Sequence, residues 1–334
     1  MTALSPPPTS TAQGPGPGSN SLVRPVAGAF AVLAGLDLLI THFHHRPGNV
    51  PPVVLGKNTG VPVVPTNTDF PYSHSHTIVA IILLGGLGAV GFAFAVREAI
   101  RKRDYLPLFI SLGTVAVVFP EVFVDIVGMV YYPTHSGDFA FQIFGRRMGW
   151  FIVGGWFGAG AFAGLMIKAL RARPTAKQAW LLLLATGVSY SIFEEFLVTS
   201  GGMYQYYGNQ PMWWHSLPLW WTPCNVIGCA LLPAAFGYRY QHVLSGWRAS
   251  VMLLVVPACV AGAYALIAMP SWIVVNADYP WLPTQLAGLA TWALGIGLIA
   301  VVLNLFLGYR PFDPDSRPWP PGTAPRYVPE ESTG

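Results

Sequence analysis

The sequence predicts an all-α integral membrane protein, a polytopic bundle of about eight transmembrane helices with both termini in the cytoplasm. Hydrophobic residues make up 53% of its 334 residues and charged residues only 10%, against roughly 25% charged in an average soluble domain. The apolar residues come in runs of about 20, the length that crosses a bilayer core. This composition excludes a soluble enzyme, a nucleic-acid-binding protein and a disulfide-stabilised secreted domain, so the bilayer is the expected partner.

The chain divides into three expected parts. Residues 1–23 and 309–334 are low-complexity segments rich in Pro, Gly, Ser and Thr, and we expect both to be disordered tails. Residues 24–308 form the transmembrane domain. Its apolar runs predict spans at residues 25–43, 77–96, 106–131, 148–169, 179–199, 218–238, 250–270 and 284–308.

The Lys and Arg residues orient these spans. With eight spans, 14 of these residues fall on the side of the termini and 4 on the other side. Cytoplasmic loops of membrane proteins carry the excess of positive charge. We therefore expect a multi-pass protein of the cell membrane with both termini cytoplasmic, and with loops 44–76, 132–147, 200–217 and 271–283 outside.

Five acidic residues inside predicted spans are the candidate catalytic groups: Asp37, Glu121, Asp125, Glu194 and Glu195. A carboxylate in hydrocarbon costs at least about 2.5–3.5 kcal/mol, so such residues are functional candidates by default. Glu121 and Asp125 are four residues apart and share one helical face. Two close carboxyls in a dry site can supply a neutral acid and a charged base. The structural alternative is that the acids only bind Arg146, Arg147 or polar groups of neighbouring helices.

Aromatic and amide side chains predict the wall of a binding pocket. The segment from 202 to 225 is unusually rich in Trp and Tyr, more so than the interfacial belt of a membrane protein requires. Such rings can line a lipophilic pocket and steady a developing carbocation. The candidate substrate-binding residues are Tyr131, Tyr132, Tyr204, Tyr206, Trp213, Trp214, Trp220 and Asn225.

A weak internal repeat relates the third and fifth predicted spans. Glu, Val, Gly and Met coincide between residues 121–132 and 195–207 at a shift of 74 residues, and a Tyr pair follows each. Both predicted helices run outward, so a duplication would be of the parallel type.

Histidines near the first long loop raise the possibility of a metal site. His42 lies just before the loop 44–76, and His44, His45, His74 and His76 lie at its two ends. Membrane di-iron enzymes need more His motifs, placed at the cytoplasmic ends of helices, and the three cysteines have no metal-type spacing. We therefore predict no bound metal and no cofactor.

The acidic helix ends resemble a known family. Glu195 followed by Gly202-Met203-Tyr204-Gln205-Tyr206, with Asp125 and Tyr131-Tyr132-Pro133 earlier, resembles the AveC-like spirocyclases, integral membrane proteins of actinobacterial type. The resemblance covers the third to sixth spans and leaves the loop 44–76 unmatched. It implies spiroketal closure on a polyketide of secondary metabolism, sometimes with dehydration, and it transfers no catalytic residue.

The residues themselves are compatible with such chemistry. Ring closure needs an acid, a base and a dry pocket that holds one folded conformation of a lipophilic chain. We expect acid-base cyclisation or hydration of a polyketide- or isoprenoid-like substrate that enters from the bilayer, with Glu121 and Asp125 as one pair and Glu194 and Glu195 as the other. Two alternatives stay open, a proton-coupled transporter and a membrane protein without catalysis.

Overall fold

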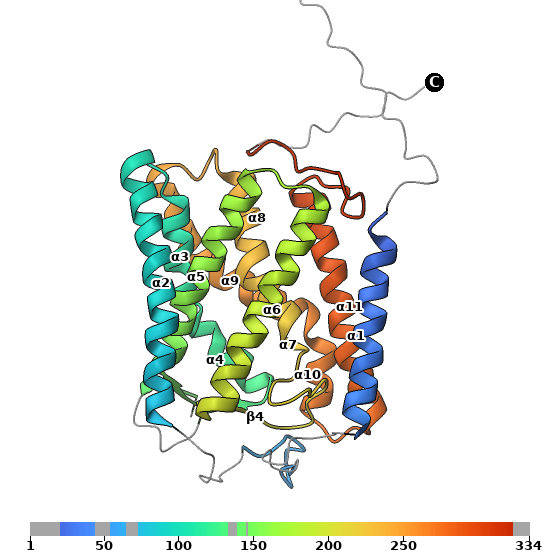
Figure 1. Cartoon of the computed structure of the whole chain (residues 1–334). Coiled ribbons are helices and arrows are strands. Elements are labelled where there is room, and N and C mark those ends of the chain that lie inside the picture. The colour runs from blue at the N-terminus through green and yellow to red at the C-terminus, as the bar shows by residue number, and fades with distance from the viewer. Residues whose placement is uncertain (1–20, 44–53, 65–72, 133–138, 145, 323–334) are drawn as a thin grey trace, which may run out of the picture.

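The computed structural model describes residues 21–43, 54–64, 73–132, 139–144 and 146–322, and it is a bundle of helices that lie side by side (Figure 1). The helix α1 stands at one edge beside α11, and α2 stands at the opposite edge. The helical elements are α1 (Val23–Phe43), α2 (His74–Lys102), α3 (Leu106–Ala116), α4 (Val118–Val127), α5 (Trp150–Arg171), α6 (Ala176–Gly201), α7 (Trp221–Asn225), η1 (Val226–Leu231), α8 (Leu232–Tyr240), η2 (Gly246–Val251), α9 (Met252–Ile267), α10 (Met269–Val275), α11 (Trp281–Val301) and η3 (Val302–Phe306).

Two small antiparallel sheets lie where helices end. One pairs β1 (Val130–Tyr131) with β4 (Gln205–Tyr206), and the other pairs β2 (Phe139–Ile143) with β3 (Arg146–Gly149). Each of the eight predicted spans coincides with helical structure over most of its length, so the helical fold class is confirmed. Short strands lie in two of the predicted loops, and β1 replaces the predicted helix at the end of the third span, where α4 stops at Val127.

Five helical segments are long and apolar enough to cross a membrane: α1, α2, α5, the continuous η2–α9 and the continuous α11–η3. The pair α3 and α4, bent by 43°, is a sixth if it counts as one span. The two other predicted spans, α6 and α7–η1–α8, are helical but are not among these candidates. A multi-pass membrane protein follows from these helices, while the count of eight and the side of the termini stay predictions.

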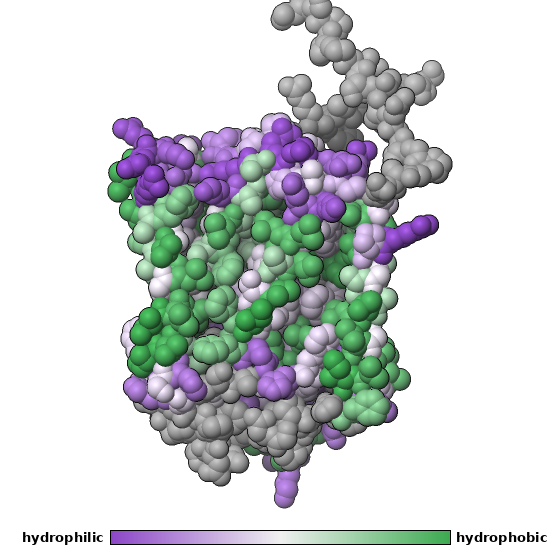
Figure 2. Space-filling view, in the orientation of Figure 1, coloured by the Kyte–Doolittle hydropathy of each residue, from purple (hydrophilic) through white to green (hydrophobic). Residues whose placement is uncertain are grey.

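The surface of the bundle carries a broad apolar band. In Figure 2 hydrophobic side chains cover the middle of the visible face, and hydrophilic ones gather at the rim where α2 ends and α6 begins. Basic residues stand at those helix ends, among them Arg101 and Lys102 in the last turn of α2 and Lys168 and Arg171 in the last turn of α5. This pattern matches a helix bundle immersed in a bilayer.

Small residues bring α2 and α5 into close contact. A Cβ added to Gly88 would lie 2.7 Å from the backbone carbonyl carbon of Phe157, and one added to Gly91 would lie 2.8 Å from the Cα of Ala161. Small residues let helix backbones approach closely in membranes, where packing replaces the hydrophobic drive.

Prolines interrupt two of the spans near the middle of the bundle. Pro120 occupies the first turn of α4, where no backbone donor is needed, and the chain bends between α3 and α4. In the sixth span, α7 passes into α8 through the π-helical turn η1, and Pro233 stands at the start of α8. Both interruptions lie beside the residues that form the candidate site.

The prediction of a disordered tail from residue 309 is wrong for residues 309–322. Tyr309 is fully buried, and its hydroxyl donates to the Pro174 carbonyl at 2.9 Å. The Arg173 guanidinium donates to the Pro318 carbonyl at 2.9 Å, and the Trp319 ring covers Gly308. These two aromatic anchors fold the segment onto the end of the bundle despite its proline-rich composition. Residues 1–20 and 323–334 of the predicted tails lie outside the described residues.

Candidate functional site

A cavity of about 120 Å³ lies between α4, α5, α6 and the start of the sixth span. Three acidic side chains reach it, and aromatic rings form most of its wall. Its polar and aromatic lining consists of Glu121, Asp125, Tyr132, Phe151, Trp156, Phe162, Tyr190, Phe193, Glu194, Tyr204, Tyr206, Trp221, Asn225, Cys229 and Tyr264. The cavity therefore combines carboxyl groups with tyrosine hydroxyls in an otherwise apolar setting.

The break between α3 and α4 positions the first two acids. Glu121 stands in the first turn of α4. Asp125 follows one turn later and is buried, and both line the cavity, as their spacing predicts. The Tyr132 hydroxyl donates to Asp125 Oδ2 at 2.7 Å, and the Trp156 indole is the hydrogen-bonding neighbour of Glu121.

The helix α6 supplies the third acid. The Tyr206 hydroxyl donates to Glu194 Oε1 at 2.7 Å, and the Asn225 amide donates to Oε2 at 3.4 Å. Asn225 in turn accepts from the Tyr264 hydroxyl at 2.5 Å. Glu194 is also close enough to Glu121 for their charges to interact. The sequence left open whether the acids of the third and fifth spans share a cavity, and these three do.

The paired strands β1 and β4 join the ends of α4 and α6. Val130 pairs with Tyr206 and Tyr131 with Gln205. Left-handed residues, Met129 (φ 58°) and Gly202 (φ 55°), turn the chain out of each helix. The two ends of the predicted repeat thus contact each other, and their pairing holds Tyr206 against the cavity.

The tyrosines beyond the helix ends are neutral donors. Burial raises the pKa of Tyr132, Tyr204 and Tyr206 well above the ordinary value, and the neighbouring carboxyls raise it further. Burial also raises the pKa of Tyr131 to about 12. A buried hydroxyl that keeps its proton can donate to a carboxylate or to a substrate oxygen.

The predicted arginine partners bind elsewhere. Arg146 donates to the Tyr207 hydroxyl at 2.8 Å, and the Arg147 guanidinium lies 5.3 Å from the centre of the Phe139 ring. Arg146 still acts on Asp125 through its charge. Within the described part of the chain, the three cavity acids form no ion pair.

The expectation that Glu194 and Glu195 form a second catalytic pair is wrong in its geometry. Successive residues of a helix point about 100° apart, so Glu195 faces away from the cavity. Its Oε1 lies 2.5 Å from His215 Nδ1, and the Ser216 backbone N–H donates to its Oε2 at 3.3 Å. Glu195 lines a separate groove on the other side of α6.

Asp37 also lies away from the cavity. It is fully buried in α1 and faces the indole of Trp214, and neither of its carboxyl oxygens has a hydrogen-bond partner among the described residues. The first helix packs chiefly on α11, so it cannot bring this residue to α4.

Four of the eight predicted substrate-binding residues line the cavity: Tyr132, Tyr204, Tyr206 and Asn225. The other four do not. The Tyr131 hydroxyl donates to Gln205 Oε1 at 2.6 Å, and the Trp220 indole donates to Gln210 Oε1 at 2.8 Å. The Trp213 ring contacts the Tyr206 ring edge-on, with ring centres 6.1 Å apart. Trp214 lines the separate groove that also contains Glu195. Much of the aromatic segment therefore builds the support of the cavity rather than its wall.

Sequence reasoning missed several wall residues. Tyr190 stands four residues before Glu194, a helical spacing that places both on one face, and this signal was available. Trp156, Cys229 and Tyr264 belong to other helices, and no spacing in the sequence connects them with the acids. Phe162 contacts both Tyr190 and Phe193, with ring centres 5.4 and 6.3 Å apart, and closes the cavity between α5 and α6.

The candidate metal ligands are only partly described. His42 lies against Phe43 and Trp281, and His44 and His45 lie outside the described residues. Among the residues that the structure describes, no three His, Cys, Asp or Glu side chains are placed to hold a metal ion.

Comparisons with known proteins return no relative. No protein-family model, no curated protein and no solved structure matches this chain. The functional argument therefore rests on the geometry of the cavity.

Proposed function

We propose that this membrane protein is a cofactor-independent acid-base catalyst that cyclises or hydrates a lipophilic, polyketide- or isoprenoid-like substrate. The observation that carries the proposal is the convergence of Glu121, Asp125 and Glu194 on one cavity walled by aromatic rings. The resemblance to AveC-like spirocyclases favours spiroketal closure among the possible cyclisations.

The carboxyl groups can divide the acid and base roles. Three negative charges in a small apolar cavity repel one another, so a protonated carboxyl and a carboxylate coexist there. In ring closure the carboxyl protonates a carbonyl oxygen, the substrate hydroxyl oxygen bonds to the carbonyl carbon, and the carboxylate takes the hydroxyl proton. A spiroketal forms when the resulting hemiketal loses water and a second hydroxyl closes the other ring.

The hydrogen bonds assign the starting roles. Glu194 accepts from Tyr206 and Asn225, and Asp125 accepts from Tyr132, so these two are held as acceptors. We assign Glu194 as the base and Asp125 as a charge that is fixed by Tyr132. Glu121 also accepts a hydrogen bond, from the Trp156 indole N–H, but the charges of both Asp125 and Glu194 act on it and disfavour its ionised form, so we assign it as the proton donor.

The size of the cavity limits what enters it. At about 120 Å³ it holds the reacting atoms of a substrate and not a whole lipophilic molecule, which needs roughly 300–1,000 Å³. We propose that the reactive end enters between α5 and α6, where Phe162 meets Tyr190 and Phe193. The rest of the chain stays among apolar side chains at the bilayer.

The test compares two neighbouring residues of one helix. Wild type, Glu121→Gln, Glu194→Gln and Glu195→Gln are purified in nanodiscs and incubated with lipophilic polyketide and isoprenoid precursors, and products are followed by mass spectrometry. We expect a product of unchanged mass or one shifted by one water. In Glu121→Gln and Glu194→Gln the loss of general acid-base catalysis should lower the rate of product formation by about 10²–10⁴-fold. Glu195→Gln should form the product at the wild-type rate. Equal losses in all three variants would contradict the assignment to the cavity.

A second candidate is a proton-coupled transporter, which the small volume of the cavity favours. The space suits several water molecules, each of about 30 Å³ in the liquid, and such waters can pass protons between Glu121 and Glu194. Sealed vesicles that contain a pH-sensitive dye separate the two functions. Proton or solute movement that Glu194→Gln abolishes, without any product in the nanodisc assay, would replace the catalyst by the carrier.

A further inference from the structure

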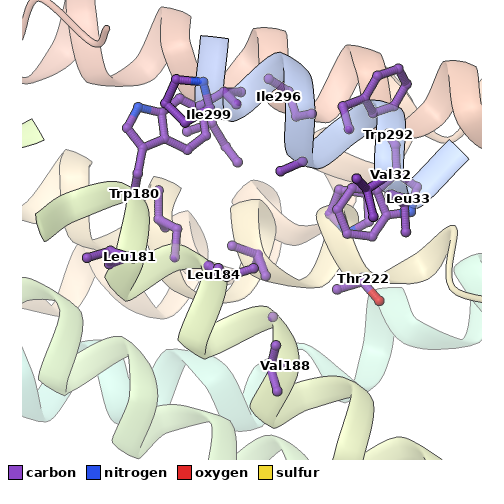
Figure 3. A pocket seen from close by; sticks show the side chains of 18 of the residues that line it. Val32, Leu33, Trp180, Leu181, Leu184, Val188, Thr222, Trp292, Ile296 and Ile299 are labelled. Carbon is purple, nitrogen blue, oxygen red and sulfur yellow. The ribbon is translucent and has the colours of Figure 1, made fainter. Parts of the chain in front are cut away.

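A second and much larger space lies on the opposite side of α6 from the acidic cavity. It is a groove of about 2,070 Å³ between α1 and α6, with α11 and the start of the sixth span as its floor. Figure 3 shows Leu184 and Val188 of α6 on one side, and Val32 and Leu33 of α1 with Trp292 of α11 on the other. Its volume exceeds the roughly 300–1,000 Å³ of small-molecule pockets.

The groove is separate from the acidic cavity. The Ser191 and Thr222 hydroxyls, 2.9 Å apart, join α6 to α7 along the wall between the two spaces. Gly187 on the same wall packs against Thr222 and Val226, whose methyl groups would lie 3.3 and 3.2 Å from an added Cβ. A molecule bound in the groove would therefore not reach the acidic cavity through this wall.

The length of the groove matches one bilayer core. Its lining runs along α6 from Lys177 to Glu195, a rise of about 27 Å at 1.5 Å per residue, against about 30 Å of hydrocarbon. The lining in between is almost wholly apolar, and Val32 and Leu184 are exposed to the space. Extended acyl or isoprenoid chains fit such a groove.

The charges at its two ends give the occupant a direction. Arg24 of α1 and Lys177 of α6 stand at one end, where within the described part of the chain neither side chain has an ion pair or hydrogen bond. The carboxylate of Asp315 lies at the same end, so two cations face one anion. The other end carries Glu195, bound to His215. An anionic head group is favoured at the first end and repelled at the second.

We propose that this groove binds an anionic phospholipid of the predicted cytoplasmic leaflet, with its phosphate between Arg24 and Lys177 and its chains between α1 and α6. That leaflet holds the anionic lipids of a cell membrane, and each Lys or Arg near its surface contributes to their attraction. The site is independent of the catalysis proposed for the acidic cavity.

The test is native mass spectrometry of the delipidated protein titrated with phosphatidylglycerol or with phosphatidylcholine of the same chains. We expect phosphatidylglycerol to bind about fivefold more tightly than phosphatidylcholine, because the two cations contribute roughly fivefold each and the Asp315 carboxylate offsets one of them. Arg24→Gln with Lys177→Gln removes this preference, and Asp315→Asn increases it. The matched control, Arg97→Gln with Arg101→Gln, removes two exposed cations from α2 and leaves the preference unchanged.

Three results would overturn the proposal. One is equal binding of both lipids that the Arg24 and Lys177 substitutions do not change, and another is binding of inorganic phosphate without lipid. The third is a dimer of the chain that carries no lipid. Val188→Trp, which narrows the groove beside α6, checks the location of the chains. It should weaken binding of both lipids at this site while far-UV circular dichroism shows the helical fold retained.

Discussion

Substitution of Gly308 by alanine should destabilise the protein, because this residue ends the last helix in a conformation that suits glycine. Its φ is +78°, and an added Cβ would lie 2.0 Å from the Trp319 ring. The left-handed backbone costs about 1–2 kcal/mol for alanine. Displacing Trp319 also disturbs its 2.8 Å backbone hydrogen bond to Leu307, which contributes about 1 kcal/mol. The same displacement disturbs the cation–π contact in which the Arg239 guanidinium lies 5.3 Å from the centre of the Trp319 ring. Loss of this contact costs about 0.5–1 kcal/mol.

We therefore expect the free energy of unfolding to fall by about 3 kcal/mol. The measurement is SDS titration in mixed micelles, followed by far-UV circular dichroism. The control is Gly297→Ala in α11, where no heavy atom lies within 4 Å of the added Cβ. Alanine is the better helix former by about 1 kcal/mol, so this variant should unfold at higher SDS. Equal shifts in both variants would refute the reasoning, because they would show that neither the backbone angle nor Trp319 matters.

Three further predictions concern packing, pH and activity. Gly88→Ala should lower the free energy of unfolding by about 1–3 kcal/mol, because the added Cβ would lie 2.7 Å from the backbone of α5. The control Gly86→Ala should not lower it, since no heavy atom lies within 4 Å of its Cβ. SDS titration of both variants measures the difference. Since burial raises the pKa of Tyr131 from 10.0 to about 12, the folded state keeps a proton that the unfolded state loses. Its contribution is complete below pH 10 and is lost as pH rises through 12, so Tyr131→Phe should show a flatter loss of stability over that range. Tyr206→Phe removes a hydrogen bond to Glu194 worth about 1.5–3 kcal/mol and should slow product formation by about 10–100-fold with the helical fold intact; an unchanged rate would remove Tyr206 from the mechanism.

The helices were predictable because hydrophobic runs and basic helix ends directly report bilayer crossing. Residues 25–43 and 148–169, for example, coincide with α1 and α5 to within two residues at each end. The break at Pro120 was not predicted, because the apolar run continues through it. The packing of residues 309–322 was also not predicted, because the many prolines of this segment indicated disorder and the two aromatic residues that anchor it, Tyr309 and Trp319, give no pattern in the sequence.

The site was predictable where one helix carries the signal. The spacing of Glu121 and Asp125 places them on one face, and both line the cavity. The spacing of Glu194 and Glu195 excludes a shared face, because successive residues of a helix point about 100° apart. This was visible in the sequence. Contacts between helices, such as that of Tyr264 with Asn225, depend on packing that no local pattern encodes.

The dependence of α1 on α11 has a consequence for biosynthesis. The helix α1 leaves the ribosome before all the other described helices, whereas α11, against which it packs, follows only after nine further α-helices. Until then Asp37, which is fully buried in the finished protein, faces lipid or the translocation machinery, at a cost of about 2.5–3.5 kcal/mol. The assembled bundle recovers this cost last, so chains truncated before Trp281 should be the ones that membrane quality-control proteases degrade.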